Sequence, residues 1–448
     1  MASIWGRQGG QVVLTCWGEP ADLSFREGSD SFSLMSILCG WPLGERKTAS
    51  SGGGMIDYDN VGSMFASMVL GLALICAIHF GAARAHRTAM VPISIFFFCV
   101  MLTEIVYLGE EVLGDDAFVL AMPWIIGPAL MANLVLSPVF WMYVRAMTAE
   151  EPRGITSRDW VHFLLPLLGA GVGFGFWMLP PETRHLFMTA DVEADDLAPF
   201  ALAVALSFLL IEIIAYIQYC VYFTFIMRRL YRYRARLRDL FASTEGIEMR
   251  WLGVLTLVFF AYWTLSVTHL VLQLFVDVEI LNAAFDEALN LAMISSFALW
   301  ALREKPGLIR AAMEQDETAR KLAQPKYEKS ALTDAHAQRI ADKIGAVMER
   351  EKLYADPNLS LAVLSKRIGV SQNYVSQPLN ETLGTTFFDY VNRLRVQAAL
   401  DPIRSGEDTV LAIAYAVGFN SRSSFYKAFK KETGHTPSSF KAAEPAMT

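Results

Sequence analysis

Residues 413–437 read IAYAVGFNSRSSFYKAFKKETGHTP and have the pattern of two helices joined by a tight turn. Apolar residues within 413–417 fall on one side of the first helix, and Gly418-Phe419-Asn420 is typical of a turn. A second helix is predicted directly after the turn, with Phe425 and Phe429 on its inward side. This order predicts a helix-turn-helix unit, whose second helix enters the major groove of DNA.

A related pattern lies earlier in the chain. Ser365, Gly369 and Val375 have the separations of a helix-turn-helix: a small residue where two helices cross, a glycine in the turn and a branched residue in the core. Apolar residues around them recur at helical spacing, namely Leu359, Leu361, Leu364, Ile368, Val370 and Leu379. Two such units predict a composite helical domain over residues 329–443.

Several strings in this domain resemble the DNA-binding domain of the AraC/XylS family of transcription regulators. They are PNLSL at 357–361, FFDYVNRLR at 387–395, GFNS at 418–421, Ser424-Phe425, FKK at 429–431 and GHTP at 434–437. The resemblance covers roughly residues 329–443. It implies that a linking helix near 387–399 joins the two units, and that each unit presents one recognition helix to successive segments of the major groove.

The resemblance also implies which side chains contact DNA. Amide side chains pair with adenine and arginine pairs with guanine, whereas lysine contacts to phosphate add affinity and salt dependence. The expected base readers are Gln372, Asn373 and Gln377 in the first unit, and Ser421, Arg422, Ser423 and Lys427 in the second, with Arg422 reading guanine. The expected phosphate contacts are Lys366, Lys430 and Lys431. For each single residue, a solvated helix face is the alternative.

Two prolines depart from the family pattern. Pro378 stands in the predicted first recognition helix, and Pro402 follows the predicted linking helix, where family members usually carry an apolar helical residue. A proline inside a helix removes a hydrogen bond and clashes with the preceding turn. We therefore expect the first unit to be kinked, short or weak, and the second unit to carry most of the base reading.

The region before this domain has the composition of a membrane domain. The chain is 54% hydrophobic and 19% charged, and its long apolar runs lie within residues 61–302. About 20 apolar residues in a helix cross a bilayer. The expected fold class is all-α, with a seven-helix transmembrane bundle followed by a soluble helical domain with two helix-turn-helix units. The spans are predicted at 61–83, 88–108, 117–144, 159–180, 198–227, 251–276 and 283–302.

Arginines predict the orientation of these spans, because Lys and Arg beside a span favour the cytoplasmic side. The first, third and fifth predicted loops carry twelve arginines, whereas the second, fourth and sixth carry only Arg184 among many acids. The N-terminus is expected outside and the C-terminal domain in the cytoplasm, at a bacterial inner membrane. The net charge is -7, yet residues 329–448 hold 15 Lys+Arg against 12 Asp+Glu, so the acidity lies elsewhere. The arginines of 228–238 are expected to meet anionic lipid, with DNA contact as the alternative.

The remaining segments set the domain boundaries. Residues 1–60 form a tail with neither a signal peptide nor a periodic pattern. The Ser-Gly-Gly-Gly run before Met55 is what a translated ribosome-binding stretch would give, so we expect Met55 to be the true start; a disordered outer tail is the alternative. Residues 303–328 are expected to form a cytoplasmic linker, and residues 444–448 a short tail.

Polar residues inside the predicted spans are candidates for a signal site. They are His79, Glu104, Asn133, Glu212, Gln218, His269, Gln273 and Asn290. Polar groups in hydrocarbon are costly and often functional, although hydrogen bonds between helices are the alternative explanation. Glu104 and Glu212 are the strongest candidates because a carboxylate within a span needs a partner or a proton, and His79 and His269 accompany them.

These patterns predict a membrane-bound regulator that couples a membrane or extracytoplasmic signal to promoter binding. The expected partners are double-stranded DNA, the lipid bilayer, an unidentified signal ligand or membrane protein, and a second copy of the chain. The alternative is a membrane receptor whose altered helix-turn-helix domain docks a protein instead of DNA. The sequence has no nucleophile-base pair, metal-ligand spacing or internal repeat, so we expect no enzyme, catalytic residue, metal, cofactor or transporter.

Overall fold

The computed structural model describes residues 58–84, 86–113, 115–149, 156–184, 198–245, 247–276, 283–303, 334–406 and 408–443. These residues are mostly helical, and the only strand-like pairing among them is an isolated bridge between Phe241 and Ser360. The predicted all-α class is therefore confirmed for the described residues. The predicted start at Met55, the linker beyond Arg303 and the 444–448 tail lie outside them.

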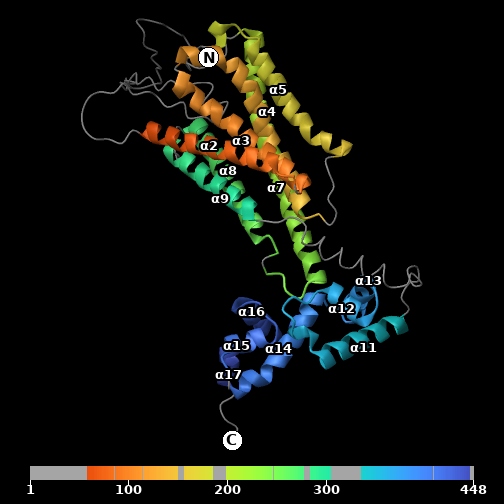
Figure 1. Ribbon diagram of the computed structural model, residues 1–448. Helices are drawn as coiled ribbons and strands as arrows, with labels where there is room; N and C mark the ends of the chain where they lie inside the picture. Colours follow the sequence, from red (N-terminus) through yellow and green to blue (C-terminus); the bar gives the residue numbers. More distant parts are fainter. Residues whose placement is uncertain are drawn as a thin grey trace, which may run out of the picture.

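The N-terminal half is a bundle of long helices (Figure 1). They are α2 (Tyr58–Ala82), α3 (Arg87–Leu113), α4 (Asp115–Met147), the short η1 (Ser157–Phe163), α5 (Leu164–Trp177), α7 (Pro199–Leu240), α8 (Arg250–Val276) and α9 (Ala283–Arg303). Helix α3 packs between α2 and α4, while α5 lies on α4 and α9 lies on α2. Large apolar side chains such as Ile75 and Ile78 point outward, as lipid-facing residues do.

Six helices in the described ranges are long and apolar enough to cross a membrane: Val61–Ala82, Arg87–Gly109, Trp124–Met147, Ser157–Trp177, Pro199–Leu240 and Arg250–His269. The seventh predicted span, 283–302, coincides with α9 but is not among these six. Helix α9 is nevertheless part of the bundle, because its Phe297 is fully buried against Phe96, Phe140 and Phe259. A count of seven spans stays a prediction.

Helix α7 is much longer than predicted. The expected span ended at residue 227, with the following arginines in a loop, but the helix continues through them to Leu240. Its 42 residues extend about 60 Å at the usual helical rise, whereas the hydrocarbon core of a bilayer is about 30 Å thick. Arginine is a good helix former, so the charges end the apolar segment without ending the helix. Figure 1 shows α7 leaving the bundle and reaching the C-terminal domain.

The C-terminal domain begins at α11 (Asp334–Glu351). Its other elements are η3 (Leu353–Ala355), α12 (Leu361–Ile368), α13 (Gln372–Gln377), η4 (Pro378–Thr382), α14 (Phe387–Ser405), α15 (Val410–Ala416), α16 (Arg422–Thr433) and α17 (Pro437–Ala443). Helix α14 is the predicted linking helix and passes through two apolar cores, with Phe387 and Val391 in one and Val396 and Ile403 in the other. The predicted end of this helix at 399 was too early, because α14 accommodates Pro402 in its last turn.

Candidate DNA-binding site and its contact with the membrane domain

The pair α15 and α16 has the geometry expected from the sequence. Gly418 has a φ of 97°, a left-handed conformation that favours glycine, and it turns the chain between the two helices. The Ser421 hydroxyl accepts a hydrogen bond from the Ser424 amide at 3.3 Å and so caps the N-terminus of α16. Phe425 and Phe429 are fully buried and fix the inward face of α16. Its opposite face is left to solvent.

That solvent face carries the side chains predicted to read bases in the second unit. Arg422, Ser423 and Lys427 are exposed, and Ser421 is half-buried at the cap. The Arg422 guanidinium lies over the ring of Tyr426, 4.9 Å from its centroid, and donates a hydrogen bond to the Tyr426 hydroxyl. This stacking orients the side chain of Arg422, which is the first residue of α16.

Of the predicted phosphate contacts, Lys366 and Lys430 are exposed on their helices. Lys431 is also exposed, but its ammonium group pairs with the Asp389 carboxylate at 2.6 Å and so ties α16 to α14. A structural ion pair is therefore a second role for Lys431 beside the predicted one.

The pair α12 and α13 agrees with the prediction in one respect and differs from it in another. Helix α13 has only six residues, because the chain continues from Pro378 as a wider π-helical turn, η4. This agrees with the expected short first recognition helix. Gln372, at the first position of α13, is buried, whereas a base reader would be exposed; its role in reading bases stays a prediction. Asn373 is exposed, and Gln377 donates to Glu381 within the same segment.

Arg395 is a central residue that sequence reasoning did not single out. Only 1% of it is exposed, and its guanidinium donates to the carbonyl oxygens of Tyr354 and Asp356 at 2.7 and 2.8 Å. It also lies over the ring of Phe419, which belongs to the α15–α16 turn. Burial lowers the pKa of Arg395 to about 10, so it stays charged at neutral pH. Arg395 thus joins both halves of the domain.

Comparison with known proteins addresses the same region. Residues 364–443 match a family model described as a helix-turn-helix domain. An uncharacterized HTH-type transcriptional regulator of Staphylococcus aureus (strain COL) is 33% identical over 107 residues, which are 24% of this chain and 14% of the relative. One from Bacillus subtilis (strain 168) is 25% identical over 118 residues, which are 26% of this chain and 15% of that relative. The chain therefore matches only about one seventh of the length of these relatives.

The C-terminal domain is a helix-turn-helix domain. The predicted resemblance to the AraC/XylS family is confirmed for this part of the chain. A solved structure of a protein of unknown function from Listeria innocua is also similar, with 27% sequence identity and a TM-score of 0.21; the match covers 24% of this chain and 97% of that one.

The helix-turn-helix domain is in direct contact with the end of α7. The chain leaves α7 at Phe241 and returns to the bundle at α8, and we name residues 241–245 and 247–249 the docking loop. The Ala242 amide donates to the Leu359 carbonyl at 3.0 Å, beside the bridge between Phe241 and Ser360. Arg395 donates to the Ala242 carbonyl at 3.3 Å. The contact therefore reaches the same buried arginine that joins the halves of the domain.

The docking loop also reaches the N-terminus of α16. The Ser421 hydroxyl donates to the Glu245 carboxylate at 2.6 Å, and the Asn420 amide donates to the Ser243 hydroxyl at 3.0 Å. Within the loop, the Glu248 carboxylate accepts from Thr244 and from Arg250, and these bonds hold the pKa of Glu248 below its usual value. The loop is thus internally braced with Glu245 turned toward the domain.

The arginines of 228–238 lie on the C-terminal part of α7, and several of them contact protein. Arg229 donates to the Thr148 hydroxyl at the end of α4, Arg234 donates to the Glu248 carbonyl, and Arg238 lies over the ring of Phe388 in α14. The expected contact of this stretch with lipid head groups stays a prediction.

Among the predicted signal residues, the structure joins Glu104 with α9. The Glu104 carboxylate, 6% exposed, accepts a hydrogen bond from Asn290 at 2.9 Å, and Asn290 also bonds Glu287. Nearby, the Tyr262 hydroxyl of α8 donates to Asp286 at 3.0 Å, and His269 interacts electrostatically with Asp286. Glu287 and Asp286 were not singled out from the sequence, since they lie where the seventh span was predicted to begin.

Glu212 and His79, which were also predicted to form the signal site, lie apart from the group around Glu104. Glu212 hydrogen-bonds Tyr216 one turn along α7, and His79 is exposed on α2 with its ring against Phe80. The described residues therefore do not bring the four candidates into one site.

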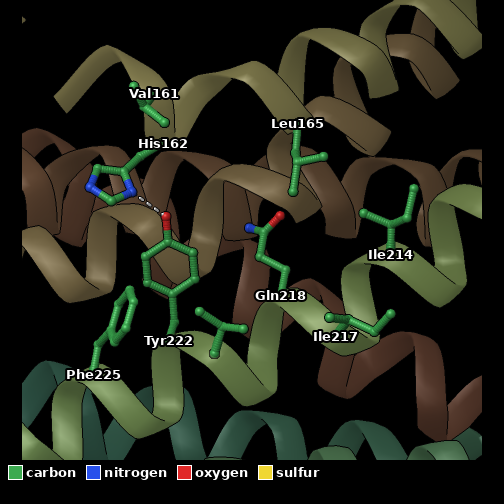
Figure 2. A pocket seen from close by; sticks show the side chains of 9 residues that line it. Val161, His162, Leu165, Ile214, Ile217, Gln218, Tyr222 and Phe225 are labelled. Carbon is green, nitrogen blue, oxygen red and sulfur yellow. Dashed lines mark hydrogen bonds between the residues drawn. The ribbon is translucent and has the colours of Figure 1, made fainter. Parts of the chain in front are cut away.

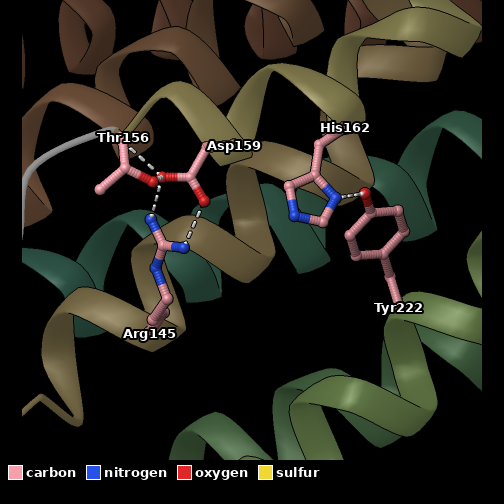
Figure 3. A network of polar contacts seen from close by, with 5 residues as sticks. All are labelled: Arg145, Thr156, Asp159, His162 and Tyr222. Carbon is pink, nitrogen blue, oxygen red and sulfur yellow. Dashed lines mark hydrogen bonds and ion pairs between the residues drawn. The ribbon is translucent and has the colours of Figure 1, made fainter.

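A pocket of about 320 Å³ lies between η1, α5 and α7, and Figure 2 shows its lining. The buried Gln218 amide donates to the Leu134 carbonyl and the Ser137 hydroxyl of α4, so it holds α7 against α4. At the pocket's rim His162 and Tyr222 are hydrogen-bonded at 2.6 Å. Figure 3 shows this pair beside a bidentate ion pair between Arg145 and Asp159, which fixes the end of α4 to η1.

Proposed function

We propose that this chain is a membrane-bound transcription regulator that binds DNA through residues 329–443. The observation that carries the proposal is the exposed first turn of α16, where Arg422 is held by Tyr426 beside a capped helix N-terminus. Helix N-termini and cations fix a protein on phosphates, and an arginine at this position reaches guanine in the major groove. The helix-turn-helix match and the regulator names of the relatives support the same function.

We infer that α7 carries the coupling between membrane and DNA. The helix runs without interruption from the bundle to the docking loop, and Leu240 and Ala242 belong to the same buried apolar cluster as Leu359 and Leu361. A displacement of α7 in the membrane would therefore act directly on the helix-turn-helix domain. The proposal includes seven spans, an outer N-terminus, an inner-membrane location and a pair of recognition helices, α13 and α16.

We infer further that the signal acts near Glu104, whose carboxylate connects α3 to α9. In the proposed topology, Glu104 and Asp286 lie toward the outer ends of their helices, where a signal from outside would arrive. The ligand or membrane partner stays unidentified, and pairing of two chains is part of the proposal because it would double the DNA contacts.

The test is genome-wide occupancy of the full-length protein in cells that express it natively. Wild-type protein should crosslink to a small set of promoters, and Arg422→Ala should lose most of these sites while the protein stays in the membrane fraction. Arg339→Ala is the matched control, because Arg339 is an exposed arginine on α11 and belongs to neither recognition helix. Occupancy that is unaffected by Arg422→Ala, or absent in the wild type, would reject DNA reading through α16.

A further inference from the structure

We propose that the docking loop and DNA compete for the N-terminus of α16, with Glu245 standing where a DNA phosphate binds. The inference rests on the proposed function and adds a partner surface to it: the membrane domain holds the helix-turn-helix domain through the same helix end that DNA needs. The described state is then the DNA-free state of the regulator.

The N-terminus of α16 has the chemistry of an anion site. The first amides of a 12-residue helix point outward without helical partners, and the helix dipole makes this end favourable for anions. Such an end commonly receives a phosphate in DNA complexes. Here the carboxylate of Glu245 is 2.6 Å from the hydroxyl of Ser421, the residue that caps this helix. An anion from the chain's own membrane domain thus occupies a position suited to phosphate.

The docking loop covers little of the surface that is predicted to read bases. Asn420 and Ser421 carry the contacts, whereas Arg422, Ser423 and Lys427 stay exposed. DNA that approached these three side chains would bring its phosphates toward the cap and meet the Glu245 carboxylate. The Glu245 carboxylate and a DNA phosphate are both negative and repel each other at short range. The loop and the duplex therefore exclude one another at the Ser421 cap, even though the rest of the recognition helix is exposed.

The docking loop also has a second contact with the domain, at a place that DNA does not need. Ala242 is bonded to Leu359 and to Arg395, on the side of the domain next to α7. The Glu245 end can therefore leave α16 while the domain stays attached to the membrane. A shift of α7 that moves the loop would change DNA affinity without releasing the domain, which gives the proposed coupling a defined point of action.

The test uses full-length protein in phosphatidylcholine nanodiscs and the duplex recovered in the occupancy experiment, with fluorescence anisotropy at fixed salt. Glu245→Gln keeps the shape of the side chain and its acceptor oxygen but removes the charge. It should tighten DNA binding about two- to fivefold, which is the size of a carboxylate's interaction with a helix N-terminus. Glu349→Gln makes the same charge change at an exposed carboxylate of α11, outside the docking loop and the recognition helices, and should leave the affinity near wild type.

A second measurement follows the wild-type loop itself. Adding the duplex should speed hydrogen exchange of the backbone amides in 241–245 and 247–249, because the Glu245 end leaves the domain. Equal affinity of Glu245→Gln and wild type, an equal gain for both glutamines, or slower loop exchange with DNA would each overturn the competition. If the wild-type chain binds no duplex at all, the proposed function itself fails, and this outcome is distinct from the others.

Discussion

At the scale of single residues, two positions hold the helix-turn-helix domain together from inside. Gly418 lies so close to η3 that an added Cβ would be 2.7 Å from the carbonyl oxygens of Tyr354 and Ala355. Arg395 donates to the carbonyls of Tyr354 and Asp356 in the same segment. The turn before α16 and the linking helix therefore depend on one stretch of backbone, so changes at either residue should be felt across the domain.

Gly418→Ala should destabilise the domain by about 2–4 kcal/mol, because it adds a clash with backbone to a left-handed conformation. Gly369→Ala is the matched control: Gly369 also has a positive φ, but an added Cβ there meets nothing within 4 Å. The control should cost only about 1–2 kcal/mol. The temperature at which trypsin cleaves the domain in the full-length protein measures both, and equal losses would show that the η3 contact is unimportant.

Arg395→Met should destabilise the domain by about 2–4 kcal/mol, since it leaves buried carbonyls without donors. Arg393→Met is its control on the same helix, because Arg393 is half-exposed and forms a 3.6 Å ion pair with Glu432. The same proteolysis assay should show little change for the control. Wild-type stability of the Arg395→Met protein would mean that apolar packing can replace the hydrogen bonds of the guanidinium.

At the scale of elements, helix pairs in the bundle are set by close backbone contacts as much as by apolar surface. An added Cβ on Gly173 of α5 would overlap the backbone of Gly127 in α4, so the two helices meet at a pair of glycines. Small residues at such crossings are typical of membrane helices, where burial of apolar area alone does not favour helix association. Helix α5 also lines the Gln218 pocket through Leu165, and Gln218 donates a hydrogen bond to the Leu134 carbonyl of α4.

Gly173→Ala should force α4 and α5 apart and lower the thermal midpoint of the detergent-solubilised protein by several degrees. Gly171→Ala is two residues away on the same helix and meets nothing within 4 Å, so it should keep the wild-type midpoint or raise it slightly through its better helix propensity. Similar midpoints for the two variants would argue against a tight α4–α5 crossing.

The elements also show which parts of the structure could be predicted from sequence. The turn at Gly418, the inward Phe425 and Phe429 and the short helix before Pro378 follow from local patterns, and all are found. The predicted end of this helix at 227 was wrong, because hydropathy indicates where the apolar segment ends. The arginines that follow continue α7 to Leu240.

Other features depend on partners that are far apart in the chain. Arg395 meets Ala242 across 153 positions, and Glu245 meets Ser421 across 176, so no local spacing indicates either contact. Gln372 carries the amide expected of a base reader, but it is buried, and burial depends on how the whole domain packs. The grouping of Glu104 with Glu287 through Asn290 likewise depends on how α3 and α9 pack, which hydropathy does not determine.

At the scale of the whole molecule, we propose that a bundle in the membrane presents a helix-turn-helix domain to DNA through α7. The bundle and the domain share a buried apolar cluster at the end of this helix, so they are mechanically connected. The arginines of 228–238 surround the connection, which fits a helix end that lies near a membrane surface on the cytoplasmic side.

The most direct test compares the two orientations of native membrane vesicles. Labelled promoter duplex should be retained by inverted vesicles, whose cytoplasmic face is outside, and Arg422→Ala should abolish the retention. Right-side-out vesicles from the same cells should retain none until they are opened. Sequence-selective retention by sealed right-side-out vesicles, or none by inverted vesicles that contain the intact chain, would contradict the account.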